Sequence, residues 1–144
     1  MGENANLNIL IVEDNFEHLR LTTYILEQHD VPGAIFVVRD GQEAMDYLYR
    51  RRQFADPASS PMPHLILLDL NIPRIDGKEF LKIIKSDQTL RQIPVIVMSS
   101  SDREEDIQFA RAMGAAAYVS KSHGFEKLSE ALASIHTFAA KYGP

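Results

Sequence analysis

The sequence predicts an α/β protein in which a parallel β-sheet is covered by helices on both faces. Five short apolar segments recur along the 144 residues, and a segment with helical spacing follows each of them. Strands that alternate with helices in this way are typical of a parallel sheet with two helical layers. The first, third and fourth segments are almost wholly aliphatic, as expected for strands that are buried on both sides.

The expected elements follow one another along the whole chain. The strands are predicted at Leu7–Val12, Ala34–Val38, Leu65–Leu70, Ile93–Met98 and Ala116–Val119. The helices are expected to begin near Asn15, Asp40, Asp76, Asp102 and Phe125. Asp40 and Asp102 stand where helix N-caps belong, and Asp14 or Asn15 could cap the first helix.

Between the second helix and the third strand, residues 54–64 are rich in proline and serine and are expected to form a loop. The basic run 50–52 before it is interpreted as the solvated last turn of the second helix. No repeat or second domain is visible. We therefore expect a single domain over residues 1–144, with a core of about residues 7–142 and no output module.

Composition excludes several classes of function. The absence of cysteine excludes a disulfide scaffold, a thiolate zinc site and a cysteine nucleophile. A net charge of −5 disfavours binding to nucleic acid. No apolar stretch approaches the ~20 residues needed to span a bilayer, and the N-terminus lacks a basic or apolar targeting segment. A cytoplasmic protein without a membrane partner is expected.

Polar side chains stand at the carboxyl ends of four predicted strands. The first strand ends in Glu13 and Asp14, the third in Asp69, the fourth in Ser99, and Lys121 follows the fifth. In an open parallel sheet these ends form one edge, and ligands bind there where the strand order reverses. The sequence thus predicts three carboxylates, a hydroxyl and an ammonium at one site.

This set of groups suits phosphoryl transfer. Crowded carboxylates repel one another unless a cation lies among them, and an oxygen-only site favours Mg²⁺. Asp69 is then a candidate nucleophile that would form an aspartyl phosphate. Mg²⁺, Lys121 and Ser99 would compensate the charge on the phosphoryl oxygens.

Each residue alone also has a simpler interpretation. Glu13 and Asp14 could only cap a helix, Asp69 could be a turn residue, Ser99 part of a loop and Lys121 a surface lysine. The four strand ends taken together favour a site.

At these residues the chain resembles the receiver domains of response regulators, over nearly its whole length. The matching segments are residues 9–15, 65–77, 93–99 and 114–121. The resemblance implies a flavodoxin-like fold with strand order 2-1-3-4-5 and a histidine kinase as phosphoryl donor. It implies Asp69 as phosphoacceptor, Lys121 and Ser99 as phosphoryl contacts, Tyr118 and Ser99 as switch residues, and Mg²⁺ held by Glu13, Asp14, Asp69 and the main-chain carbonyl of Asn71.

The chain departs from the usual receiver pattern at one position, and it is most similar to one subgroup of the family. Most receiver domains place a cis proline after the lysine, whereas Ser122 follows Lys121 here, so either a cis or a trans bond is open. The chain is more narrowly similar to the single-domain regulators paired with bacterial phytochromes. That similarity implies a phytochrome as the kinase.

The main alternative is a Mg²⁺-dependent phosphatase with an aspartate nucleophile. Such enzymes resemble one another in an Asp-x-Asp motif, and the second acid is replaced here by Asn71. The histidines, at positions 18, 29, 64, 123 and 136, show no metal-ligand spacing and are interpreted as surface or loop residues.

A homodimer is also predicted. The last predicted helix carries an apolar stripe, most of which is expected to pack on the sheet. Phe138 and Tyr142 lie near its end, where burial against the same chain is difficult, and we expect them in a two-fold interface with the fourth helix and the fifth strand.

Overall fold

The computed structural model describes residues 7–28, 34–121 and 127–133. Its strands are β1 (Ile9–Val12), β2 (Ile35–Val38), β3 (Leu65–Asp69), β4 (Val95–Ser99) and β5 (Ala117–Ser120). Its α-helices are α1 (Phe16–Gln28), α2 (Gly41–Leu48), α3 (Gly77–Ser86) and α4 (Glu104–Ala112), and residues 127–133 are helical as well. Short 3₁₀ turns occur at Arg52–Phe54 and Leu90–Gln92. The predicted alternation is confirmed, with strand ends shifted by one or two residues.

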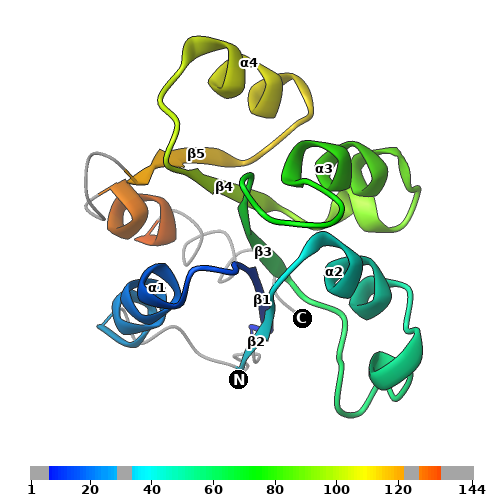
Figure 1. Cartoon of the computed structure of the whole chain (residues 1–144). Helices are drawn as coiled ribbons and strands as arrows, with labels where there is room; N and C mark the ends of the chain where they lie inside the picture. The colour runs from blue at the N-terminus through cyan, green and yellow to red at the C-terminus, as the bar shows by residue number, and fades with distance from the viewer. Residues whose placement is uncertain (1–6, 29–33, 122–126, 134–144) are drawn as a thin grey trace.

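The five strands form one parallel sheet in the order β2-β1-β3-β4-β5 (Figure 1). The predicted fold class and strand order are therefore confirmed. The chain leaves β1 toward β2 on one side and returns to β3 on the other side, so the strand order reverses between β1 and β3. Asp69, the last residue of β3, lies at this reversal, where open α/β sheets bind their ligands.

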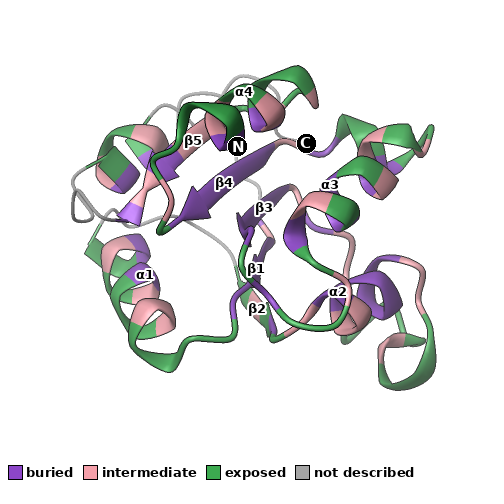
Figure 2. Ribbon diagram, turned by 45° about the horizontal axis from the view of Figure 1, so that its top comes forward, coloured by how far each residue is buried: buried purple, intermediate pink, exposed green. Residues whose placement is uncertain are grey.

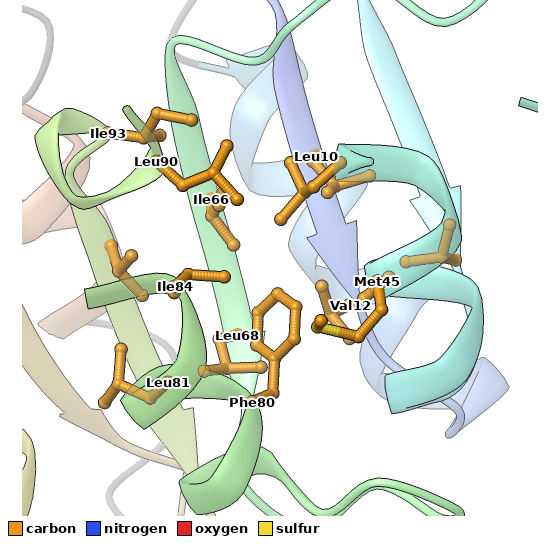
Figure 3. Packing of buried hydrophobic residues seen from close by; sticks show 14 of the residues in the cluster. Leu10, Val12, Met45, Ile66, Leu68, Phe80, Leu81, Ile84, Leu90 and Ile93 are labelled. Atoms are coloured by element: carbon orange, nitrogen blue, oxygen red, sulfur yellow. The ribbon is translucent and has the colours of Figure 1, made fainter. Parts of the chain in front are cut away.

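Alternate residues of the strands enter two cores, one on each face of the sheet. On one face, Leu10, Val12, Ile66 and Leu68 pack against α2 and α3, with Phe80 fully buried among them (Figure 3). On the other face, the intervening strand residues pack against α1 and the helix over residues 127–133. Figure 1 shows these two helices on one side of the sheet and α2 and α3 on the other.

The interior strands differ from the edge strands in burial, as their sequences predict. Every residue of β1, β3 and β4 is buried, whereas β2 exposes Ile35 and Val37 and β5 is mostly half-buried (Figure 2). The three almost wholly aliphatic segments are thus the strands covered on both faces.

The N-terminal caps of the helices hold the turns beside the sheet edge. Asp40 accepts a hydrogen bond from the Glu43 amide at 2.7 Å, as predicted, and Asn15 accepts one from the His18 amide at 3.0 Å. The prediction for Asp102 is wrong, because Arg103 occupies the N-cap position of α4 and its side chain makes no capping bond. The hydroxyl of Ser101 instead accepts from the Arg103 amide, at 3.2 Å.

The basic run at residues 50–52 lies beyond the second helix, and the prediction that it forms the last helical turn is wrong. Helix α2 ends at Leu48, and Arg50 and Arg52 have positive φ angles of 56° and 53°. The guanidinium groups of Arg51 and Arg52 lie 4.0 and 3.5 Å from the buried carboxylate of Asp46. Both pairs lie where the chain leaves the helix for the proline-rich loop.

Two glycines fix the loop that joins β3 to α3. The Gly77 amide donates to the carbonyl of Leu70 at 3.1 Å, and the Gly41 amide donates to the carbonyl of Pro73 at 3.2 Å. A Cβ at Gly77 would collide with the backbone of Leu70, and one at Gly41 with the carbonyl of Ile75. Only glycine allows backbones to approach so closely at these positions.

Some predicted features fall outside the described residues. They are the Lys121–Ser122 bond, the start of the last helix near Phe125, the interface residues Phe138 and Tyr142, and the histidines at positions 29, 123 and 136. Within the described ranges, no helix is long and apolar enough to cross a membrane.

Candidate functional site

Four of the predicted site residues meet at the carboxyl edge of the sheet. Glu13 follows β1, Asp69 ends β3, Ser99 ends β4, and Lys121 follows β5. All four are buried, with 2%, 6%, 1% and 9% of their surface exposed, respectively. Charged and polar groups are rarely buried to this extent unless they are paired or bind a ligand.

Lys121 lies at the centre of this site, and we call Lys121, Glu13, Asp69 and His18 the Lys121 cluster. The Lys121 ammonium donates to Glu13 Oε1 at 2.6 Å and to Asp69 Oδ2 at 3.0 Å. It also lies 3.0 Å from Nδ1 of His18. One ammonium thus serves two buried carboxylates from the two strands on either side of the strand-order reversal.

The Lys121 cluster carries more negative than positive charge. Burial raises the pKa of Glu13 from its ordinary 4.5 to about 7. The hydrogen bond from Lys121 lowers that pKa, and the neighbouring Asp69 raises it. A carboxyl group in this position is stabilised in its charged form by a further cation.

Asp14 and Asn71 frame the cluster from outside. The Asp14 side chain is exposed, in contrast to that of its neighbour Glu13. Asn71 is exposed as well, and its backbone N–H donates to Asp69 Oδ1 at 2.9 Å. Its side-chain Nδ2 lies 3.5 Å from Ser99 Oγ. The structure thus brings Asn71 to both Asp69 and Ser99.

His18 is a site residue that sequence reasoning missed. It lies in the first turn of α1, where its Nδ1 is 4.0 Å from Glu13 Oε2. Burial and the positive charge of Lys121 lower the pKa of its imidazole. The interpretation of His18 as a plain surface or loop residue is therefore wrong. The sequence did contain a signal for this contact. The first helix was expected to begin directly after Glu13 and Asp14, so a side chain in its first turn, such as that of His18, lies near the acidic pair.

Ser99 and Tyr118 are linked through the loop between β4 and α4. Ser99 Oγ accepts a hydrogen bond from the amide of Ser101 at 3.1 Å. The Tyr118 hydroxyl donates to the carbonyl of Ser101 at 2.7 Å. Tyr118 packs against the α2 and α3 core, whereas its neighbour Val119 enters the opposite core. Both predicted switch residues therefore contact the same loop residue.

A second charged group, which we call the Asp106 cluster, lies beside the first and was not predicted. Its members are Asp106, Lys78, Ser101 and Arg103. The Asp106 carboxylate lies 2.5 Å from Lys78 Nζ, accepts from Ser101 Oγ at 2.5 Å, and lies 3.4 Å from Arg103 Nε. These contacts, with that of Lys78 foremost, lower the pKa of Asp106 to about 2 although the side chain is buried. The cluster joins the first turns of α3 and α4.

A polar pocket of about 330 Å³ lies beside the Asp106 cluster, next to Ser99. It is lined by Leu70, Asn71, Ile72, Asp76, Lys78, Ser99, Arg103 and Asp106. The pocket therefore extends from the site hydroxyl of Ser99 to the ion pair between α3 and α4.

The Lys121 cluster fits a divalent cation. Glu13, Asp69 and His18 each offer one ligand atom, and these atoms lie within 4.8 Å of one another. Two buried carboxylates with one ammonium between them leave charge for a cation to compensate. The donor set is dominated by carboxylate oxygen, which hard divalent cations prefer.

The family model of the response regulator receiver domain matches residues 9–133. The chain belongs to this family. A receiver domain is the signalling domain of a two-component system.

The relatives of this receiver domain include regulators that work with phytochromes. The response regulator Rcp1 of Synechocystis sp. is 35% identical over 130 residues, which cover 90% of this chain and 86% of that protein. The structure of the phosphorylated cyanobacterial phytochrome response regulator RcpA is 41% identical, with a TM-score of 0.80, and the match covers 93% and 94% of the two chains. The Mn²⁺-bound form of Rcp1 is 33% identical, with a TM-score of 0.80 and coverage of 96% and 97%.

Proposed function

We propose that this receiver domain is switched by phosphorylation of Asp69, with a histidine kinase as donor and Mg²⁺ as cofactor. The observation that carries the proposal is the buried Asp69 carboxylate, hydrogen-bonded to Lys121 at 3.0 Å, at the point where the strand order reverses. Family membership supports the same assignment.

The proposed step is a displacement at phosphorus. A carboxylate oxygen of Asp69 forms a bond to the phosphorus of a phosphohistidine, and the bond from phosphorus to the imidazole nitrogen breaks. The imidazole leaves with the electron pair of that bond and takes up a proton, while Asp69 becomes an acyl phosphate. Hydrolysis later returns the carboxylate and releases phosphate, so the domain catalyses only its own modification and its reversal.

The residues around Asp69 have distinct roles in this step. Lys121 neutralises one carboxylate oxygen of Asp69 before transfer and would pair with a phosphoryl oxygen afterwards. Ser99 carries a hydroxyl on the adjacent strand that would donate to a second oxygen. The backbone amide of Asn71 already donates to Asp69 Oδ1, which holds the carboxylate in one orientation.

We assign the Mg²⁺ site to Glu13, Asp14, Asp69 and the main-chain carbonyl of Asn71. The excess of carboxylate in the Lys121 cluster supports a cation here, and the relative Rcp1 has a Mn²⁺-bound form. When bound, the ion would supply positive charge to the carboxylates and to the phosphoryl oxygens. Asp14 is exposed, so it could join such a site from the solvent side.

We further propose a phytochrome-type histidine kinase as the partner, acting in the cytoplasm. The likeness to Rcp1 and RcpA supports this choice, because the latter is a phytochrome response regulator. The net charge of −5 supports a protein partner over nucleic acid.

The output would be a change of surface around α4, β5 and the helix that follows. Ser99 and Tyr118 both contact Ser101, so a shift of the Ser99 hydroxyl toward a phosphoryl group would reach Tyr118 through one loop residue. We propose that this surface pairs two copies of the chain, with Phe138 and Tyr142 contributing. No separate output domain is needed for such a signal.

The test is transfer of ³²P from a phosphorylated kinase. Asp69→Asn should abolish labelling while leaving the circular dichroism spectrum unchanged. Asp87→Asn is the matched control, because Asp87 follows α3 at the opposite edge of the sheet, and it should be labelled as the wild type is. Labelling of Asp69→Asn at the wild-type level would overturn the assignment. Sustained turnover of a small phosphate ester would favour the phosphatase alternative instead.

A further inference from the structure

Ser101, in the loop between β4 and α4, has all of its polar groups engaged. Its N–H donates to Ser99 Oγ at 3.1 Å, and its carbonyl accepts from the Tyr118 hydroxyl at 2.7 Å. Its own hydroxyl donates to Asp106 Oδ2 at 2.5 Å and accepts from the Arg103 amide at 3.2 Å. The backbone of Ser101 therefore contacts both proposed switch residues, while its side chain contacts the start of α4.

The acid that holds the Ser101 hydroxyl is itself anchored to a neighbouring helix. Asp106 is buried in the first turn of α4, and its Oδ1 lies 2.5 Å from the ammonium of Lys78 in the first turn of α3. The same ammonium lies 5.4 Å from the centre of the Phe109 ring, about one turn further along α4. If Ser101 moved alone, it would have to leave Asp106. If α4 moved with it, the contacts of Lys78 would have to break.

The contact of Lys78 is the one that ties this loop to α3. Arg103 Nε also lies 3.4 Å from the Asp106 carboxylate, but Arg103 is the N-cap residue of α4 and cannot hold that helix to another one. The side chain of Lys78 is 40% exposed and that of Asp106 is 7% exposed, so solvent screens the pair only in part. A contact of this strength can bias an equilibrium between two surface states without preventing either state.

We propose that Lys78 and Asp106 form a latch, which holds Ser101 in this position and opposes the shift of Ser99 toward a phosphoryl group. The inference rests on the proposed function and adds to it the contacts that set the balance between the two surface states. Because linkage is reciprocal, a weakened latch should let a ligand of the switched state bind more tightly. Lys78 and Asp106 are positioning residues, since they act on Ser99 through Ser101.

The decisive measurement is the affinity of the full chain for beryllofluoride, which in the presence of Mg²⁺ stands in for a phosphoryl group on aspartate. The titration can be followed by ¹H–¹⁵N NMR through the amide of Ser101, whose hydrogen bond to Ser99 should change. Lys78→Met should bind beryllofluoride about three- to fivefold more tightly than the wild type. Lys82→Met is the matched control, because it makes the same change at an exposed position one turn along α3, and it should bind as the wild type does.

A double-mutant cycle tests whether the latch acts through Ser101. Ser101→Ala removes the two hydrogen bonds of the hydroxyl and keeps the backbone contacts to Ser99 and Tyr118. It should tighten beryllofluoride binding by a similar factor. In the double variant with Lys78→Met the two effects should not add, because each change releases the same contact.

The possible results separate the latch from the proposed function. Unchanged or weaker binding by Lys78→Met, equally tight binding by Lys82→Met, or additive effects in the double variant would overturn the latch and leave the proposed function intact. A lowered melting temperature of Lys78→Met with unchanged affinity would assign the pair a structural role alone. A wild type that neither binds beryllofluoride nor accepts phosphate would overturn both.

Discussion

The Lys121 cluster and the Asp106 cluster lie side by side at the same edge of the sheet, and each pairs a lysine with buried acid. Their charge balance is opposite. In the Lys121 cluster two carboxylates share one ammonium, and burial raises the pKa of Glu13 to about 7. In the Asp106 cluster one carboxylate has a lysine, an arginine and a hydroxyl, and its pKa falls to about 2.

The difference distinguishes a cluster that can still take up a cation from an ion pair whose charge is already compensated. Asp106 is paired with a lysine and an arginine and accepts a hydrogen bond from Ser101, so its charge is already compensated, and it joins α3 to α4. The Lys121 cluster has unmet negative charge at a buried position, which costs free energy until an ion or a phosphoryl group with its cation arrives. Such imbalance is a physical mark of a functional site.

The largest expected effect comes from removing the shared ammonium. Lys121→Met leaves two carboxylates buried together and should lower the free energy of unfolding by about 3 kcal/mol in the absence of divalent ions. Urea denaturation checks this, and added Mg²⁺ should recover part of the loss. Lys82→Met, at an exposed site on α3, should change little. An equally stable Lys121→Met protein would mean that the cluster is not short of positive charge.

The Asp106 cluster should respond less strongly and without any dependence on metal. Asp106→Asn weakens the contacts to Lys78, Ser101 and Arg103 and should cost about 1–2 kcal/mol, since Lys78 and Arg103 are partly solvated. The same urea experiment with and without Mg²⁺ measures it. If Mg²⁺ restored the lost stability of Asp106→Asn, the two clusters would not differ in their need for a cation.

Acid titration should separate the same variant from the wild type. The pKa of Asp106 is lowered from 3.8 to about 2, so its contribution to stability is complete above pH 4 and is lost as the pH falls toward 2. The difference in unfolding free energy between wild type and Asp106→Asn should therefore narrow across this range. A difference that stays constant from pH 5 to pH 2 would contradict the lowered pKa.

The smallest effect is expected at Tyr118. Tyr118→Phe removes the hydrogen bond to the Ser101 carbonyl and should cost about 1 kcal/mol in the unphosphorylated protein. Thermal unfolding monitored by circular dichroism is sensitive enough to detect it. Tyr24→Phe, on the exposed face of α1, is the control and should leave the melting temperature unchanged.

The sheet and the members of the Lys121 cluster at strand ends could be predicted because both follow from the strand pattern. Once the strands are parallel, Glu13, Asp69, Ser99 and Lys121 must reach one edge, whatever the helices do. The burial of β1, β3 and β4 could also be predicted from the sequence, since their almost wholly aliphatic residues leave no polar face for water.

The remaining site residues depend on how helices are oriented, which the strand pattern does not determine. His18 enters the cluster because Asn15 caps α1 and aims its first turn at Glu13. Of the three acids that begin α4, only Asp106 is buried, and that choice is set by the rotation of α4 over α3. The cap predicted at Asp102 was wrong for a similar reason. The hydroxyl of Ser101, which the strand pattern does not single out, accepts a hydrogen bond from the amide of Arg103 at the start of α4.

The hydrogen bond from Lys121 to Glu13 joins residues 108 positions apart. During synthesis from the N-terminus, β1 and β3 can pair long before this lysine leaves the ribosome. Glu13 and Asp69 are then held together without the ammonium that balances them, and a shortened or stalled chain keeps them in that condition. Under the proposed function, Asp69 gains the ammonium that balances it, and with it the setting for phosphorylation, only when the fifth strand and Lys121 have been made.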